Sequence, residues 1–247
     1  DLTCQIDKVE FKHERDRFLK KEEAQAALAA SKPGPHSIAS VERKPFEQQP
    51  NPPFDLTSLQ VEAYRQFKFA PTQTLEMAQT LYEQSMISYP RTSSQKLPAK
   101  LNLGKIVQAL SKQIEYAPLC QQLISAQRFK PAEGKKEDPA HPAIHPTGQS
   151  CAVGDREQKL YDLIVRRFLA CMAPPAQRES AKVKAKCGPE IYVTSGSRTT
   201  TPGWFEFYKP YVKLEEVTLP AWKEGQSVTA TDFTQTDKMT QPPKRLT

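Results

Sequence analysis

The chain has 247 residues, enough for one large domain or two small ones. No apolar run in it approaches the length of a membrane span, and its composition is that of a soluble protein. Its formal net charge of +7 favours a polyanionic partner such as nucleic acid, although many basic proteins bind none. Its five cysteines are odd in number, widely spaced and never arranged as C-x-x-C, which argues against a zinc site or a secreted disulfide framework and favours reduced thiols in the cytoplasm.

The first part of the chain predicts strands and one short helix. Residues 2–19 alternate loosely between apolar and polar side chains, as strands do. Lys21–Ala30 are rich in Ala, Glu and Leu, which favour a helix. Prolines recur between Ser31 and Pro53, and proline lacks the N–H that a helix interior or a central strand requires. This segment is therefore predicted to hold at most an edge strand, at Ser37–Arg43, followed by a linker.

The middle of the chain predicts helices. Thr57 and Gln60 have the spacing of a capping box, so the first of these helices is predicted to have Thr57 as its N-cap. A second helix opens at Pro71, and the short turn between the two predicts a helix-turn-helix-like element. Further amphipathic helices are predicted at Gly104–Ser125 and Asp155–Met172.

Strand-like alternation returns after residue 180, with Gly and Pro turn signals between the predicted strands. The order of elements is therefore β, then α, then β again. The simplest interpretation is an α+β fold with two domains. A discontinuous β-rich domain, residues 1–53 and 176–247, is interrupted by an inserted, mostly helical domain at residues 54–175.

The segment Ile87–Ser94 carries the residues best suited to chemistry. Pro90 biases Tyr89 toward an extended backbone, in which Tyr89 and Arg91 lie on the same side of the chain. A phenol is normally protonated near neutral pH, but a neighbouring arginine favours the phenolate and can bind a phosphate through two parallel hydrogen bonds. The spacing alone nevertheless favours a simpler interpretation, a part-buried tyrosine beside a surface arginine.

Several segments, in the same order along the chain, resemble the shared motifs of type IA DNA topoisomerases. They are Phe54–Ala63, Ala78–Glu83 with Ile87–Thr92, His141–Thr147, Tyr161–Ala170, and the returning segments Pro202–Trp204 and Leu219–Gly225. The sequence Tyr-Pro-Arg-Thr is most similar to topoisomerase III and the archaeal enzymes. The resemblance reverses the interpretation that spacing alone favours and identifies Tyr89 as the nucleophile.

The resemblance implies an ATP-independent enzyme that breaks and rejoins one DNA strand through a 5′-phosphotyrosine intermediate, which allows strand passage and relaxation of negative supercoils. Tyr89 would attack the phosphate, and Arg91 and His141 would stabilise the charge that develops on it. A further group would contact DNA: Thr57, Ser58, Gln60, Thr92, Ser93, His145 and Thr147. The threonines, Ser58 and Gln60 could equally be cap or turn residues. Ser93 stands where many bacterial relatives carry an acidic residue.

The resemblance also implies partners and a cofactor. Single-stranded DNA is the expected substrate of a monomer that acts in the cytoplasm, associated with the nucleoid in a prokaryote. The family holds Mg²⁺ in a Toprim domain with a D-x-D-x-E cluster, and this sequence contains no such cluster. No metal site is therefore expected in this chain. We expect a fragment that cannot relax DNA without the Toprim and remaining domains of the same polypeptide, and whose β-rich parts form an arch that serves as a hinge.

Two alternatives stay open at this point. The chain could be the topoisomerase half of a reverse gyrase, which a helicase domain upstream would decide. It could also be a non-catalytic DNA-binding module that retains the helix-turn-helix-like element.

Overall fold

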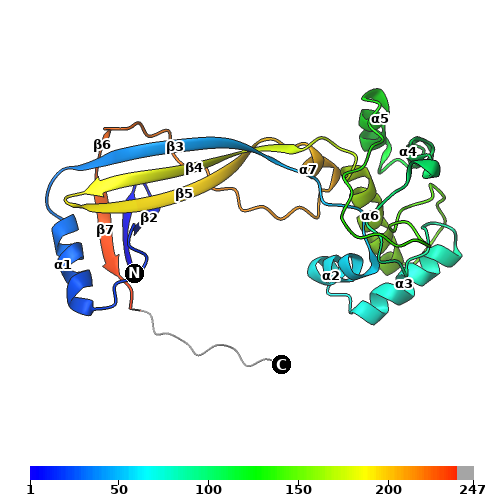
Figure 1. The fold of residues 1–247 in the computed structure, drawn as a ribbon, viewed down its shortest axis with the longest axis horizontal. Helices are drawn as coiled ribbons and strands as arrows, with labels where there is room; N and C mark the ends of the chain where they lie inside the picture. The colour runs from blue at the N-terminus through cyan, green and yellow to red at the C-terminus, as the bar shows by residue number, and fades with distance from the viewer. Residues whose placement is uncertain (238–247) are drawn as a thin grey trace. The chain divides into compact units, whose positions relative to one another are not determined.

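The computed structural model describes residues 1–237 of a mixed α+β protein (Figure 1). The chain divides into two compact units, each with its own hydrophobic core. One, here called the sheet unit, contains, of the described residues, 1–46, 178–199 and 215–237. The other, the helical unit, contains residues 47–177 and 200–214. Within the described residues, every helix is too short or too polar to span a membrane.

A seven-stranded sheet has the strand order β6-β3-β4-β5-β2-β1-β7. The strands are β1 (Leu2–Ile6), β2 (Val9–His13), β3 (His36–Gln48), β4 (Ala176–Cys187), β5 (Glu190–Thr201), β6 (Ser227–Val228) and β7 (Ala230–Gln235). β1 pairs antiparallel with both β2 and β7, and β2 pairs antiparallel with β5. Alternate residues of β4 are buried, including Val183, Ala185 and Cys187, which confirms the predicted strand periodicity after residue 180.

The sheet curls until it is nearly closed. β6 and β7 are separated by Thr229 alone, yet they lie at opposite ends of the strand order. Strands joined by one residue cannot lie far apart, so the two edges of the sheet must come close together. A hydrogen bond 3.1 Å long joins the Ala230 N–H of β7 to the His36 Nδ1 atom of β3, the strand beside β6. Helix α1 (Lys21–Ser31), which the composition of this segment predicts, packs against β7.

The strand predicted in the proline-rich segment is shorter than the strand in the structure. β3 runs through Pro45 and lies between β6 and β4 in the sheet, whereas the sequence predicts a short edge strand ending at Arg43. The reason is that the registered pairs of β6 with β3 are confined to His36 and Ser37. Farther along, within residues 1–237, β3 has a strand neighbour on one side only, and proline is tolerated in such a position.

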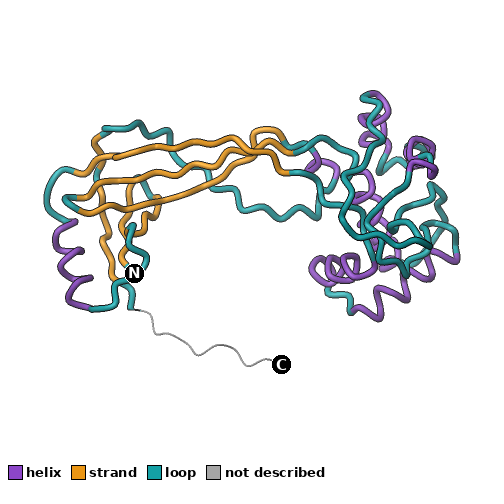
Figure 2. Tube along the Cα trace, viewed as in Figure 1, coloured by secondary structure: helices purple, strands orange, loops and turns teal. Residues whose placement is uncertain are grey.

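The helical unit, whose helices Figure 2 draws in purple, has one apolar core. Its helices are α2 (Leu56–Phe67), α3 (Pro71–Glu83), the 3₁₀ turn η1 (Ala99–Leu101), α4 (Leu103–Leu110), α5 (Ala117–Ser125), α6 (Asp155–Ala170) and α7 (Trp204–Phe207). α6 contacts α2, α3 and α7 and buries nine of its residues, Phe168 and Leu163 among them. The predicted helices at Pro71 and Asp155 are confirmed.

Two details of the helical prediction are wrong. The N-cap of α2 is Asp55 instead of Thr57, because the Asp55 carboxylate accepts the Ser58 N–H at 2.7 Å and the Ser58 hydroxyl accepts the Asp55 N–H. The segment Gly104–Ser125 is two helices instead of one. Pro118, at the second position of α5, has no N–H and would clash with the preceding turn of a continuous helix.

Arg167 of α6 is a charged residue inside the helical unit. Its side chain is buried, and the guanidinium carbon lies 4.3 Å from the ring centroid of Phe54 and 4.4 Å from that of Tyr208. The Arg167 Nη2 atom donates a 2.8 Å hydrogen bond to the Tyr208 hydroxyl. Its planar cation therefore serves as a stacking partner inside the helical unit.

Candidate active site

The Tyr89 segment is irregular backbone held by its neighbours. After α3 the chain turns at Ser85, which has a positive φ of 59°. Ile87 then forms an isolated antiparallel bridge with Pro146. The Ser88 N–H donates to the His145 carbonyl at 2.9 Å, and the Thr147 N–H donates to the Met86 carbonyl at 3.0 Å. These bonds align the Tyr89 segment with the segment that carries both candidate histidines.

A third segment joins the other two at the start of α2. Phe54 forms an antiparallel bridge with Ile144, and the Leu56 N–H donates to the Thr92 carbonyl at 3.0 Å. Three of the segments that resemble topoisomerase motifs, far apart in the sequence, therefore meet in one place. Figure 2 draws the stretch between α3 and η1 as loop, so the site is built from connecting segments on a helical framework.

Tyr89 lies against His141. Their ring centroids are 4.7 Å apart with an angle of 47° between the planes, and the ring of Tyr82, from the last turn of α3, meets Tyr89 edge-on at 5.4 Å. Tyr89 and His141 are both half-buried. The phenol is thus fixed by ring contacts on two sides, yet part of it is open to solvent.

Arg91 lies two residues after Tyr89 in the chain and is exposed. Among residues 1–237, no hydrogen bond or ion pair involves its guanidinium group. A guanidinium presents five N–H donors in a planar fork that matches the geometry of a phosphate. Chemically, the site combines a reachable phenol, an imidazole in contact with it and a cation whose donors are not used within the chain.

Four of the predicted DNA contacts have internal roles. The Thr92 hydroxyl donates to the His141 carbonyl at 3.3 Å and accepts the Ser94 N–H at 3.0 Å. The Thr147 hydroxyl donates to the Ser85 carbonyl at 2.6 Å, and that of Ser58 belongs to the α2 cap. His145 is buried with its Nδ1 atom 2.7 Å from the Ala143 carbonyl, and burial lowers the pKa of its imidazole.

The remaining predicted contacts lie nearer the surface. Thr57 and Ser93 are exposed, and Gln60 is half-buried with its amide donating to the Pro71 carbonyl at 3.1 Å. The Ser93 hydroxyl lies 3.5 Å from the Asp138 Oδ2 atom. Of the predicted set, the structure thus brings Thr92 and Ser93 close to the segment that carries His141.

Asp55 supports the site and was not among the predicted residues. It is buried, with 1% of its surface exposed, and its Oδ2 atom accepts a 2.8 Å bond from the Lys136 ammonium group. Burial raises the pKa of this carboxyl, but hydrogen bonds from Lys136 and Ser58 together outweigh burial and lower it. The spacing Asp55-x-x-Ser58 was the available sequence signal for the cap, while the pairing with Lys136 has no local signal.

Asp138 is the other residue that the sequence analysis missed. Its Oδ1 atom accepts the N–H groups of Ala140 at 2.9 Å and His141 at 3.2 Å. An aspartate directly before a proline, here Pro139, is a common way to begin a turn, and that was the available signal. Asp138 thus lies at the start of the His141 segment.

The described residues offer no place for a metal ion. Within residues 1–237, no three His, Cys, Asp or Glu side chains gather closely enough to hold one. The site residues described above therefore do not fit a Mg²⁺ centre on their own.

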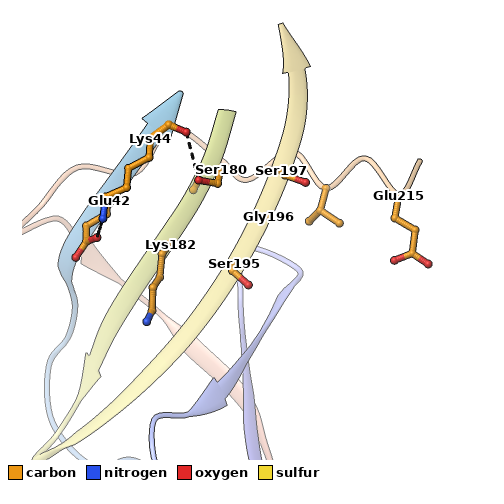
Figure 3. Close-up of a pocket in the computed structure, with 10 residues that line it drawn as sticks. Glu42, Lys44, Ser180, Lys182, Ser195, Gly196, Ser197 and Glu215 are labelled. Carbon is orange, nitrogen blue, oxygen red and sulfur yellow. Dashed lines mark hydrogen bonds and ion pairs between the residues drawn. The ribbon is translucent and has the colours of Figure 1, made fainter. Parts of the chain in front are cut away.

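A pocket of about 490 Å³ lies elsewhere, on the sheet unit (Figure 3). Its lining mixes hydroxyls with charges of both signs, among them Ser195 and Lys182, and the Ser180 hydroxyl donates to the Lys44 carbonyl at 3.2 Å. Glu42 pairs with the Lys44 ammonium group at 3.2 Å. None of the predicted site residues lines this pocket.

Comparisons with known proteins give one consistent result. A family model described as DNA topoisomerase matches residues 2–247. The chain is 46% identical over 236 residues to DNA topoisomerase 1 of Pyrococcus horikoshii, covering 94% of this chain and 34% of that protein. It is 31% identical over 211 residues to DNA topoisomerase 3-alpha of Homo sapiens, covering 85% and 21%.

Full-length topoisomerase I from Thermotoga maritima has a similar fold, with a TM-score of 0.68 at 21% identity over 94% of this chain and 39% of that one. The chain spans about one third of the length of the first curated relatives it matches.

Proposed function

We propose, since the chain belongs to the type IA DNA topoisomerase family, that it is the part of such an enzyme that breaks and rejoins one DNA strand. The observation that carries this proposal is the contact between the Tyr89 and His141 rings, with centroids 4.7 Å apart, beside an exposed Arg91. A buried structural tyrosine would use its hydroxyl within the protein. Among residues 1–237, the Tyr89 hydroxyl has no hydrogen-bond partner and is available to a substrate.

In the proposed reaction the Tyr89 oxygen attacks a backbone phosphorus of single-stranded DNA. A bond forms between that oxygen and phosphorus, the bond from phosphorus to the 3′ oxygen breaks, and the phenolic proton passes to the departing 3′ oxygen. The product is a 5′-phosphotyrosine and a free 3′ hydroxyl. Because one phosphodiester replaces another, the step is nearly balanced and reverses without ATP. Strand passage takes place between cleavage and rejoining, and it relaxes negative supercoils.

Arg91 and His141 have different parts in this proposal. Arg91 stabilises the charge on the non-bridging oxygens through its planar fork of donors. His141 touches the Tyr89 ring, so its imidazole is close enough to bind the same phosphate or to move a proton. Buried His145 is better suited to holding its own segment than to binding DNA.

The DNA-binding surface that we propose is smaller than the predicted set. Thr57 is exposed in the first turn of α2 and is available to contact the phosphate backbone. Ser93 is also exposed, with its hydroxyl 3.5 Å from the Asp138 carboxylate. Thr92, Thr147 and Ser58 use their hydroxyls within the chain, so their effect on DNA would pass through the backbone that they hold.

We further propose that residues 54–175 are a helical domain inserted into a β-rich arch of residues 1–53 and 176–247, with α2 and α3 as its helix-turn-helix-like element. These helices are joined by three residues, Lys68–Ala70, and pack against each other, which supports this reading. The arch would act as a hinge that moves Tyr89 away from the rest of the enzyme.

Mg²⁺ belongs, in this proposal, to a Toprim domain elsewhere in the same polypeptide, because the described residues provide no metal site. No step is therefore assigned here to the metal. The chain by itself would be inactive in relaxation, and the complete enzyme would act as a cytoplasmic monomer.

The test is the capture of a labelled single-stranded oligonucleotide by the full-length enzyme, followed on a denaturing gel. Tyr89→Phe should abolish the covalent adduct and leave folding unchanged, because phenylalanine keeps the ring contacts and loses the nucleophile. His141→Ala should reduce the adduct strongly. Arg91→Lys should have a smaller but substantial effect, because lysine keeps the charge and loses the planar fork.

Tyr82→Phe is the matched control, since Tyr82 is a second tyrosine in contact with Tyr89. It should form the adduct like the unaltered enzyme. If Tyr89→Phe still captures DNA, Tyr89 is not the nucleophile and the proposed function fails.

A further inference from the structure

The half-buried carboxylate of Asp138 connects the two segments that carry Tyr89 and His141. The Asp138 Oδ1 atom accepts the N–H groups of Ala140 and His141, at 2.9 and 3.2 Å. Its Oδ2 atom faces Ser93, whose hydroxyl lies 3.5 Å away. Ser93 follows Tyr89 by four residues, so Asp138 reaches both sides of the candidate site.

The local sequence explains how the Asp138 carboxylate can accept both N–H groups. Pro139 has no N–H and fixes the backbone direction, which leaves the N–H groups of Ala140 and His141 turned toward the preceding side chain. Hydrogen bonds from these N–H groups, that of Ala140 first, lower the pKa of the Asp138 carboxyl.

We propose, on the basis of the function proposed above, that Asp138 is a positioning residue for the cleavage reaction. Its carboxylate fixes the backbone where the His141 segment begins and holds it to the Ser93 turn. The imidazole therefore stays against the Tyr89 ring while Arg91, between Tyr89 and Ser93 in the chain, keeps its place beside them. Asp138 acts through these neighbours, and its own carboxylate, which would repel a phosphate, does not touch the DNA.

Other bonds also join the two segments, among them the bond from the Ser88 N–H to the His145 carbonyl at 2.9 Å. The Thr92 hydroxyl reaches the His141 carbonyl at 3.3 Å, but this is a contact between neutral groups. Asp138 instead uses a charged acceptor and several donors, and charge-assisted hydrogen bonds are roughly twice as strong as neutral ones. Loss of Asp138 should therefore not be compensated by Thr92.

Glu137 provides a matched control. It is the adjacent carboxylate, more exposed than Asp138, and it pairs with the Lys96 ammonium group at 2.6 Å. Within residues 1–237 it forms no hydrogen bond or ion pair with His141 or Ser93. A general effect of removing negative charge from this loop would appear in Glu137→Ala as well as in Asp138→Ala.

The experiment measures the rate of covalent capture of a labelled single-stranded oligonucleotide by the full-length enzyme, as a function of oligonucleotide concentration. Asp138→Ala should lower the rate at saturating DNA by about tenfold to a hundredfold, because misplaced reacting groups cost that much. The concentration for half-maximal rate should change by less than about twofold, because ground-state binding is untouched. Asp138→Asn should recover most of the rate, because its amide oxygen accepts the same two N–H groups. Glu137→Ala should behave like the unaltered enzyme.

Three results would overturn the positioning role: an undiminished rate in Asp138→Ala, an equal loss in Glu137→Ala, or an Asp138→Asn variant as slow as Asp138→Ala with unchanged circular dichroism. The last would assign the effect to charge. Failure of the proposed function looks different. In that case the unaltered enzyme captures no DNA, or Tyr89→Phe captures it as well.

Discussion

The helices of the helical unit and the connecting segments that carry the candidate site are held by different forces. α2, α3 and α6 bury rows of apolar side chains, such as Leu59, Leu81 and Phe168, none of them more than 1% exposed. The segments at residues 85–98 and 128–147 also bury apolar side chains, such as Ile87 and Ile144, but between these anchors they depend on hydrogen bonds from side chains to backbone, as at Thr92 and Asp138. Substitutions should therefore affect the two regions differently. Truncating a buried apolar side chain should destabilise the helices, whereas truncating a polar side chain should displace the connecting segments that carry the site.

The largest expected effect on stability is at Phe168, a fully buried side chain of α6. Phe168→Ala should lower the free energy of unfolding by about 3–5 kcal/mol, from lost burial and the cavity left behind. The chain has two tryptophans, Trp204 in the helical unit and Trp222 in the sheet unit. Urea unfolding followed by Trp204 fluorescence in a Trp222→Phe background therefore reports on the helical unit.

Ile114→Ala is the control for this experiment, because Ile114 is equally apolar but 91% exposed. Its effect should lie within about 0.5 kcal/mol. Equal costs for the two truncations would contradict the view that burial holds the framework.

An intermediate effect is expected where the two regions meet, at Asp55. Asp55→Ala removes the α2 cap and the bond to Lys136, and should cost about 2 kcal/mol at neutral pH. Asp55→Asn keeps the capping geometry and loses the charge, so it should cost less. The same Trp204 unfolding assay measures both.

The Asp55 contribution should also depend on pH. Because the pKa of this carboxyl is lowered in the folded chain, its stabilisation is complete above the unfolded value of about 3.9 and is lost as the pH falls through the folded value. The difference between the unaltered chain and Asp55→Asn should therefore shrink when the assay is moved from pH 7 to pH 3. A difference that grows on acidification would mean that the Lys136 pair does not form.

The smallest effect on stability is expected at Thr92, in the site itself. Thr92→Val keeps the shape of the side chain and loses both hydrogen bonds of the hydroxyl, at a cost of about 1 kcal/mol. Thr72→Val, at an exposed position in the first turn of α3, should be nearly neutral in the same assay. An equally neutral Thr92→Val would show that the hydroxyl does not help to hold the site.

The difference between the regular helices and the connecting segments also explains which features the sequence could predict. Regular elements follow from local apolar periodicity, so α1, α3, α6 and the alternation of β4 were recognisable. The errors arose where one residue decides a boundary. Pro118 divides α4 from α5, and Asp55 takes the cap that Thr57 was expected to provide.

The candidate site was predictable only in part. The spacing of Tyr89 and Arg91 favoured an ordinary structural tyrosine, and the resemblance to a known family was needed to single it out. The contacts of Asp55 with Lys136 and of Ser93 with Asp138 join residues that are distant in sequence. No local pattern encodes such pairs, because they depend on how the connecting segments meet after the helices have packed.

The pairing of β1 with β7 has a consequence for how the chain acquires its structure. Leu2 lies opposite Gln235, so the first strand described must wait for nearly the whole chain to be synthesised before it gains this partner. Bringing such distant segments together is entropically costly and makes this pairing a late event. Every residue of the helical unit leaves the ribosome before β7 does. The helical unit can therefore fold during translation, before the pairing of β1 with β7 closes the sheet.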